Sequence, residues 1–329
     1  MLRILVALLT VGALLAPVAD ARVSVGAEAA SPAKKRCRTV VKRVHGHKKK
    51  VRVCTKPKPK PKPKPKPKPT AVRRIDVGGY KLAIECRGAG SPTVVLDSGF
   101  DTDRTAFFLA QRDAAKTTRV CTYDRAGLGQ SDKRPGGGSA TTGRIVDELH
   151  TLLTRGGIGG PYVLGGWSMG GFDVRYYTKR YPADVAGLVL IDATPAEWIE
   201  QVFGGRLESG EEVMDAGSAA VELATHPSLG ARPLVDLTHG IPLTPSDAPE
   251  FPNPEASWLG LQKAVTRDSS NSILARADNV GHTIPQDNSQ LVAAAIRSVV
   301  GAVRNNTRLG PCAQTPLPRL SATCLDANA

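Results

Sequence analysis

The chain has 329 residues, which allows one or two domains, and 41% of them are hydrophobic, which suffices for a packed core. Its net charge of +14 is concentrated in one segment, because residues 22–70 carry +17 whereas residues 71–329 carry −3. The larger part of the chain is therefore slightly acidic and gives no electrostatic reason to expect a nucleic acid as its substrate.

The first 21 residues are predicted to be a secretory signal peptide. Arg3 supplies the positive start, an apolar run follows at 4–15, and the small-residue site Ala-Asp-Ala ends at residue 21. The apolar run has 12 residues, whereas a membrane-spanning helix needs about 20. We therefore expect a secreted, extracellular protein, and six cysteines in an exported chain suit three disulfides.

A basic segment with two cysteines follows the leader. In the run CRTVVKRVHGHKKKVRVC, residues 37–54, the cysteines are symmetric about residues 45–46, as a hairpin with a two-residue turn requires. Counting outward from that turn places Cys37 opposite Cys54 at a close, non-hydrogen-bonded pair, where a disulfide fits. The alternative is a disordered segment whose cysteines pair elsewhere, since two strands alone are marginally stable.

Residues 56–69 are seven Lys-Pro repeats. Alternate prolines exclude helix and sheet, so we expect a stiff polyproline II spacer of about 40 Å. We expect residues 34–68 to hold the protein to an anionic cell-wall polymer or an acidic membrane surface by a salt-dependent attraction. The alternative is a solvated tether without a dedicated partner.

From residue 72 onward, predicted strands alternate with predicted helices, which favours an α/β domain with a mostly parallel sheet. Strands are predicted at 80–86, 93–97, 119–123, 162–164, 188–191, 234–237 and 273–277, and helices at 104–116, 142–155 and 291–303.

The stretch YVLGGWSMGGFDVRYY, residues 162–177, contains the pattern G-x-S-x-G at 166–170. In that pattern a serine occupies a strained turn between a strand and a helix, with its hydroxyl exposed. Glycines are needed because backbone approaches backbone in such a turn, and the free N–H groups of the new helix favour negative charge beside the serine. Ser168 is the predicted nucleophile; the alternative is an ordinary glycine-rich turn.

Five motifs occur in one order along the chain: SGF at 98–100, DRAGLGQSD at 124–132, GWSMG at 166–170, LVLID at 188–192, and GHTI at 281–284 with Asp287. Through them the chain resembles a serine-nucleophile α/β-hydrolase, similar to secreted members from Gram-positive bacteria. The resemblance covers about residues 72–305. It implies the α/β-hydrolase fold, with a mostly parallel sheet flanked by helices and a small helical lid at about 193–231, between the sixth and seventh strands.

The expected organisation is a signal peptide at 1–21, a basic segment at 22–55, a Lys-Pro spacer at 56–70, a hydrolase domain at 71–305 and a C-terminal extension at 306–329. The family's sheet order places the strand of Cys86 beside that of Cys121, so the resemblance implies a disulfide between them. Cys312 and Cys324 remain and are paired by elimination. Some apolar lid residues, Trp198 and Phe203 among them, are candidates for an acyl pocket; the alternative is that they pack the lid onto the core.

The resemblance also implies the partners of Ser168. An alcohol needs an adjacent base, and His282 follows the predicted strand 273–277 in the family's position. Most members carry the acid after the seventh strand, where residues 238–242 offer no carboxylate. Asp192, which ends the preceding strand, is the first choice, although relatives also have a structural aspartate there. Asp247 is the second choice.

Two backbone N–H groups, of Phe100 and Met169, are expected to form the oxyanion hole. The remaining histidines, His239 included, do not match the family pattern. The loop at 124–132 is interpreted as structural, because the strand-to-helix context of a nucleotide-binding glycine loop is absent.

The predicted function is a secreted serine hydrolase that cleaves carboxylic esters through an acyl-enzyme, without a metal or organic cofactor. Amide or peptide cleavage is the alternative within the same class, as in secreted aminopeptidase relatives. A noncatalytic envelope-binding protein on a hydrolase scaffold is the alternative from another class. Epoxide hydrolases and dehalogenases carry aspartate at the elbow, so Ser168 disfavours those chemistries.

Overall fold

The computed structural model describes residues 36–44, 47–55, 71–225 and 229–325. The chain separates into two compact units, Met1–Pro67 and Lys68–Ala329. The predicted signal peptide and Lys-Pro spacer lie outside the described residues. In the part of the chain that is described, no helix is long and apolar enough to cross a membrane.

The first unit contains a hairpin of two antiparallel strands, β1 (Arg36–Val44) and β2 (His47–Thr55). Its register places Cys37 opposite Cys54, as the symmetry of the sequence predicts. The side chains of both cysteines lie outside the described residues, so the disulfide between them stays a prediction.

The second unit is built on one sheet. Its strands are β3 (Arg73–Asp76), β4 (Lys81–Arg87), β5 (Thr93–Asp97), β6 (Val120–Tyr123), β8 (Tyr162–Trp167), β9 (Val185–Ile191), β12 (Leu234–His239), β13 (Ser272–Ala277) and β14 (Ala322–Leu325). They lie in the order β14-β13-β12-β9-β8-β5-β6-β4-β3. From β13 to β6 neighbouring strands are parallel, and β14, β4 and β3 add antiparallel edges. The predicted α/β class with a mostly parallel sheet is confirmed.

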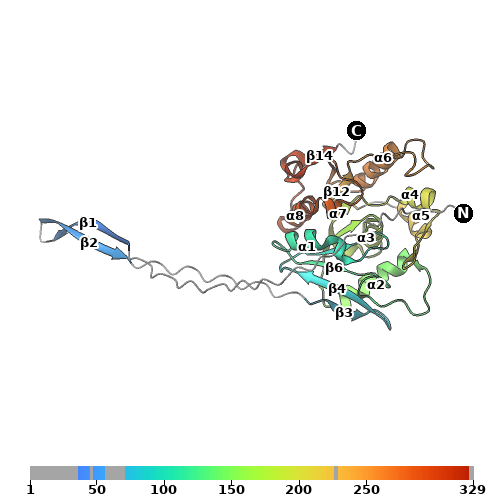
Figure 1. The fold of residues 1–329 in the computed structure, drawn as a ribbon, viewed down its shortest axis with the longest axis horizontal. Helices are drawn as coiled ribbons and strands as arrows, with labels where there is room; N and C mark the ends of the chain where they lie inside the picture. Colours follow the sequence, from blue (N-terminus) through green and yellow to red (C-terminus); the bar gives the residue numbers. More distant parts are fainter. Residues whose placement is uncertain (1–35, 45–46, 56–70, 226–228, 326–329) are drawn as a thin grey trace, which may run out of the picture. The chain divides into compact units, whose positions relative to one another are not determined.

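Helices cover both faces of this sheet (Figure 1). They are α1 (Phe108–Ala114), α2 (Thr142–Arg155), α3 (Met169–Arg180), α4 (Ala196–Phe203), α5 (Gly217–Thr225), α6 (Pro254–Arg267), α7 (Ile284–Asp287) and α8 (Ser289–Asn305). One apolar cluster joins α1 and α8 to one face, and a second joins α2 and α3 to the other. Because the central strands are covered on both sides, their sequences are continuous apolar runs.

The segment between β9 and β12 contains more than the predicted helices. Besides α4 and α5 it forms a short antiparallel pair, β10 (Arg206–Glu208) and β11 (Val213–Asp215), and β11 pairs with β7 (Ala140–Thr141). The sequence analysis also did not predict β3, α6 or β14. β7 and β14 are stabilised by strands distant in sequence, β11 and β13, which local patterns do not reveal.

Two of the predicted disulfides are confirmed. Cys86 and Cys121 face each other on β4 and β6 and are bonded. Cys312, in the 3₁₀ turn Cys312–Gln314, is bonded to Cys324 on β14. The second bond ties the C-terminal residues to the edge of the sheet, where β14 pairs with β13.

The turn from β8 into α3 brings Ser168 to the edge of the sheet. Ser168 has φ 55°, a conformation that non-glycine residues seldom adopt. A Cβ atom at Gly166 would lie 2.2 Å from the carbonyl oxygen of Gly170, and one at Gly170 would lie 2.2 Å from that of Asp97. The two glycines therefore allow the turn to fold tightly against the end of β5.

Candidate active site

Three of the predicted site residues lie together at one edge of the sheet. Ser168 follows β8, Asp192 follows β9, and His282 lies in the loop between β13 and α7. Because β8, β9 and β13 are parallel, their carboxyl ends meet at the same edge, which is where open α/β sheets place their ligands.

The His282 ring bridges the other two side chains. Its Nε2 lies 2.9 Å from Ser168 Oγ, and its Nδ1 lies 2.6 Å from Asp192 Oδ2. The indole N–H of Trp167 donates to the His282 carbonyl at 2.7 Å and so holds the loop beside the elbow. With the proton on Nδ1 donated to the carboxylate, Nε2 is free to accept the serine proton.

Asp192 is fully buried and has φ 45°. Its backbone N–H donates to the Leu237 carbonyl at 2.6 Å, which continues the pairing of β9 with β12. Its Oδ1 accepts the backbone N–H of His239 at 3.0 Å and the Thr238 hydroxyl at 3.3 Å. Burial raises the pKa of Asp192, but hydrogen bonds from His239 and His282 outweigh burial and lower the pKa to about 2.

Asp247, the second choice for the acid, is exposed and bonded within its own loop. It accepts the backbone N–H and the hydroxyl of Thr244, at 2.6 and 2.7 Å. Asp247 borders the same pocket as Ser168, but it is Asp192 that contacts His282. The geometry therefore favours Asp192.

His239, which the sequence analysis set aside, also contacts Asp192. It ends β12, its side chain is 3% exposed, and its Nδ1 lies 2.9 and 3.0 Å from the two Asp192 oxygens. Its Nε2 lies 3.1 Å from Glu255 Oε2. The adjacency of β9 and β12 produces this contact, because Leu237 pairs with Ile191 and the residues that follow meet.

A pocket of about 190 Å³ opens beside Ser168. Its apolar lining comes from α4, α6 and the loop after β12, namely Trp198, Phe203, Trp258, Ile241 and Leu243. Trp198 and Phe203 are thus at the pocket, as expected for some apolar residues of this segment. Within the described ranges, no group of three or more His, Cys, Asp or Glu side chains could hold a metal ion.

The loop after β5 packs against the elbow. A Cβ atom on Gly99 would lie 3.4 Å from the Ser168 Cβ. Among the described residues, neither the Phe100 nor the Met169 N–H donates to another protein group. These two N–H groups remain the predicted oxyanion hole.

Comparison with known proteins agrees with this architecture. A family model described as the alpha/beta hydrolase fold matches residues 93–211. An esterase structure from Thermogutta terrifontis has a TM-score of 0.53 at 24% identity, covering 71% of this chain and 99% of that one. The haloalkane dehalogenase DbeA from Bradyrhizobium elkani has a TM-score of 0.55 at 15% identity, covering 72% and 99%. The chain is an α/β-hydrolase-fold protein.

At these identities the likeness to solved structures concerns the fold alone. Among curated proteins, the probable transporter efuK from Hormonema carpetanum is 30% identical over 124 residues, which is 36% of this chain. The hydrolase-fold chain spans only 18% of the length of that relative.

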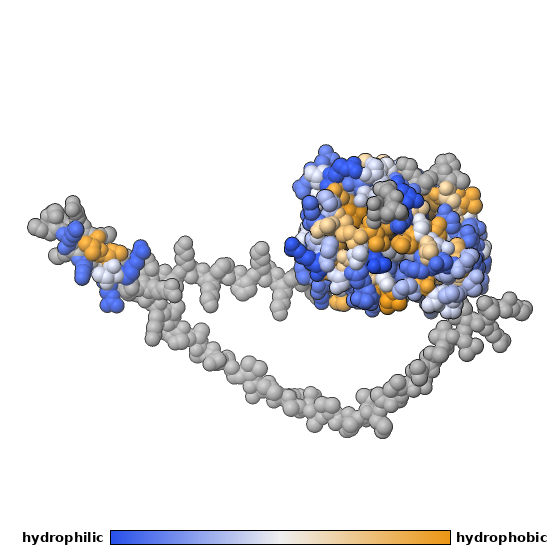
Figure 2. Space-filling model, turned by 90° about the horizontal axis from the view of Figure 1, so that it is seen from above, coloured by the Kyte–Doolittle hydropathy of each residue, from blue (hydrophilic) through white to orange (hydrophobic). Residues whose placement is uncertain are grey.

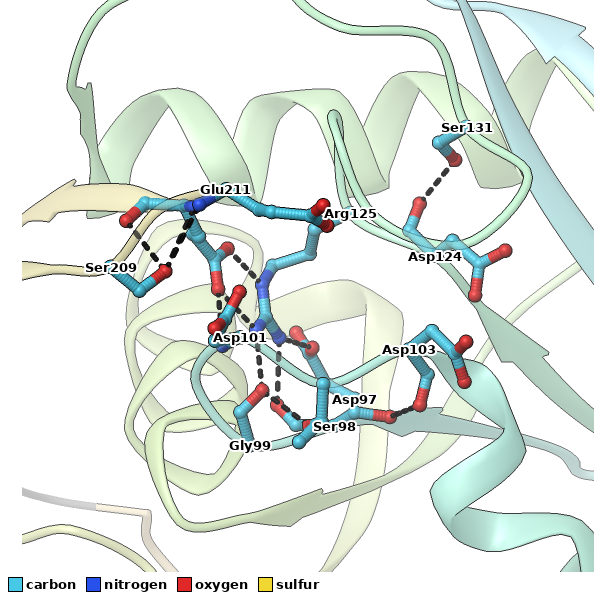
Figure 3. Close-up of polar contacts among 12 residues, drawn as sticks. Asp97, Ser98, Gly99, Asp101, Asp103, Asp124, Arg125, Ser131, Ser209 and Glu211 are labelled. Atoms are coloured by element: carbon cyan, nitrogen blue, oxygen red, sulfur yellow. Dashed lines mark hydrogen bonds and ion pairs between the residues drawn. The ribbon is translucent and has the colours of Figure 1, made fainter. Parts of the chain in front are cut away.

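A buried arginine holds the loop that carries Phe100 (Figure 3). Arg125, in the loop after β6, is 2% exposed and donates to the carbonyls of Ser98 and Gly99 at 2.7 and 2.6 Å. The same guanidinium pairs with Asp97 at 2.7 Å and with Glu212 at 2.7 and 2.9 Å. The loop at 124–132, interpreted from sequence as structural, thus supplies the cation that fixes the neighbouring backbone.

Glu212 connects this cluster to the segment between β9 and β12. It lies in the turn between β10 and β11, is 2% exposed, and accepts the backbone N–H of Asp101 at 2.8 Å. Burial raises the pKa of Glu212, but the charge and hydrogen bonds of Arg125 outweigh burial and lower it. One carboxylate therefore binds both Arg125 and the loop after β5.

We predict that Glu212→Gln lowers the free energy of unfolding by about 3 kcal/mol, because the two buried carboxylate oxygens accept three N–H groups and the amide, with one oxygen, leaves a donor unpaired. Urea unfolding measures this value. Glu211→Gln is the matched control, since Glu211 is adjacent but exposed, and should change stability by less than about 0.5 kcal/mol. Equal effects of the two substitutions would contradict the role of Glu212.

Proposed function

We propose that this protein is a serine hydrolase that cleaves carboxylic esters through an acyl-enzyme. One observation carries the proposal: Ser168 Oγ, the His282 ring and the Asp192 carboxylate form a continuous line, with contacts of 2.9 and 2.6 Å. The strained backbone at Ser168 supports it, because such strain is typical of functional residues.

In the proposed reaction Ser168 Oγ attacks the ester carbonyl carbon and transfers its proton to His282 Nε2. The tetrahedral intermediate collapses, and His282 returns the proton to the departing alcohol. His282 then deprotonates a water molecule, which attacks the acyl carbon. The bond to Ser168 Oγ breaks, His282 returns the proton to Ser168, and the acid leaves. Asp192 orients the imidazole and stabilises its cation, while the N–H groups of Phe100 and Met169 bind the oxyanion.

The pocket favours short acyl groups. Its volume of about 190 Å³ is below the roughly 300–1,000 Å³ of pockets that bind drug-sized ligands. Amides and peptides are the second substrate class, since they need the same groups. Dehalogenation by a carboxylate nucleophile is disfavoured, because Ser168 occupies the nucleophile position. A noncatalytic scaffold remains the competing proposal, and the assembled Ser168–His282 contact argues against it.

We also propose that the protein is exported and that residues 34–68 attract it to an anionic surface of the cell envelope. The disulfides Cys86–Cys121 and Cys312–Cys324 are typical of oxidising compartments. On the hairpin, Lys48, Lys50 and Arg52 alternate along β2 and are exposed, so they share one face. Hydrophilic residues flank a small hydrophobic patch on the visible side of the hairpin (Figure 2).

Turnover of p-nitrophenyl acetate, butyrate and octanoate tests the hydrolase proposal. We expect Ser168→Ala to lower kcat by at least about 10³-fold, and Asp192→Asn by about 10³- to 10⁴-fold, because the imidazole loses its orientation. Asp247→Asn, the matched carboxylate control, should stay within about threefold of wild type. Unchanged turnover in Asp192→Asn would contradict the assignment of the acid.

Binding to isolated cell envelopes tests the proposal for the basic segment. We expect the full mature chain to sediment with envelopes at low salt and to dissociate at about 1 M salt, where charges are screened beyond roughly 3 Å. A shortened protein that begins at Thr70 should stay in the supernatant. Equal sedimentation of both proteins at low salt would contradict an attraction through residues 34–68.

A further inference from the structure

Asp192 lies between two histidines that lead in different directions. His282 bridges Asp192 to Ser168, whereas His239 bridges Asp192 to the Glu255 carboxylate on α6. The reaction proposed above uses His282 and gives His239 no role. A buried histidine in contact with the proposed acid requires its own explanation.

The geometry fixes the protonation of His239. Its Nδ1 lies 2.9 Å from Asp192 Oδ1, and its Nε2 lies 3.1 Å from Glu255 Oε2. A neutral imidazole has one N–H, so one ring nitrogen would direct a lone pair at a negatively charged oxygen. The doubly protonated ring satisfies both contacts. Burial alone would lower the pKa of His239, but the hydrogen bonds and charges of Asp192 and Glu255 raise it to about 9.

Glu255 is held in place for this contact. Its Oε2 also accepts the backbone N–H of Leu243 at 3.0 Å. Glu255 lies in the first turn of α6, where the helix dipole stabilises a negative charge. Asn253 caps the same helix end by accepting the backbone N–H of Ala256. Glu255, the partner of His239 Nε2, is therefore held by the Leu243 N–H and by its place at the start of α6.

Carboxylates surround His239. Asp192 faces it from the end of β9 and Glu255 from α6, while Asp247 lies in the loop after β12 and His282 beyond Asp192. Asp192, His239 and Glu255 together carry a net charge of −1 at neutral pH. These three side chains therefore present to His282 the same net charge as a single carboxylate. The His239 ring links the two carboxylates through its two nitrogens.

We propose that His239, kept as an imidazolium by Asp192 and Glu255, is a positioning residue that fixes Asp192 and sets the negative charge that His282 experiences. The proposal rests on the proposed function, because it concerns the base of that reaction. Without His239 the remaining carboxylates carry −2, so His282 is protonated more readily. As the pH is lowered, His282 therefore stops acting as a base at a higher pH than in the wild type. Without Glu255 the His239 ring keeps its two contacts with Asp192 and stays protonated, so the Asp192–His239 pair is neutral. The cation that forms on His282 during attack then loses support.

The pH dependence of kcat/KM for a p-nitrophenyl ester tests this role in the full chain. We expect His239→Gln to move the midpoint of the acidic limb upward by about one pH unit, and Glu255→Gln to move it downward by a similar amount. Glu255→Gln should also lower kcat about tenfold. The double variant restores a net charge of −1 and should return the midpoint to within about 0.3 of wild type. A merely structural role would not produce opposite shifts that cancel.

Two matched controls accompany these variants. His150→Gln changes a histidine on α2 that contacts Tyr177, and Glu250→Gln changes an exposed carboxylate. Both should leave the acidic limb unchanged. Midpoints that move in the same direction in His239→Gln and Glu255→Gln, or a double variant that does not recover, would overturn the proposal.

Nuclear magnetic resonance of the ¹⁵N-histidine-labelled chain tests the charge without turnover. We expect both ring nitrogens of His239, assigned by their loss in His239→Gln, to carry protons at pH 7.5. A neutral ring at that pH would overturn the proposal even if the enzyme is active. A wild type that hydrolyses no ester would overturn the proposed function, and with it the positioning role, whatever the resonance of His239 shows.

Discussion

The site depends on the backbone of Ser168, which is held at φ 55° and ψ −123° between β8 and α3. An L-residue adopts this conformation only where the surroundings impose it. Here Gly166 and Gly170 allow the turn to approach itself and the end of β5, and the Ser168 N–H donates to the Ile191 carbonyl at 3.1 Å. The strain projects the hydroxyl toward His282 and leaves the first N–H groups of α3 beside it.

The parallel sheet supplies the other half of the site. The ends of β9, β12 and β13 place Asp192, His239 and the loop of His282 at one edge of the sheet. The strand order therefore brings together three segments that are distant in sequence. Asp192 receives hydrogen bonds from both histidines and from the backbone of β12. Its low pKa and buried position are compatible because these donors replace water.

A second buried cluster fixes the loop after β5, which packs beside Ser168. Arg125 pairs with Asp97 and Glu212 and binds two carbonyls of the loop after β5, which carries the Phe100 N–H. Breaking a buried pair leaves an uncompensated charge, so the cluster resists partial opening. Because Glu212 comes from the segment between β9 and β12, this segment and the loop after β5 are fixed by one carboxylate.

The sequence was informative where the signal is local. The elbow around Ser168 is a contiguous pattern with a steric cause, and the apolar runs predicted most central strands. The order of the motifs led to His282 and to Asp192 as first choice. His239 was set aside because its contact depends on the pairing of β9 with β12, which no local pattern reports. For the same reason β14, which pairs with the distant β13, was not predicted. The β10–β11 pair, which brings Glu212 to Arg125, has three residues in each strand, too few for an alternating pattern.

Covalent modification by a fluorophosphonate tests most directly whether Ser168 is the activated nucleophile. We expect one adduct per folded chain, located by mass spectrometry in the tryptic peptide of residues 156–175, and slow labelling when His282 is replaced by Gln. An adduct on another residue, or a folded wild-type chain that does not react, would contradict the activation of Ser168 by His282.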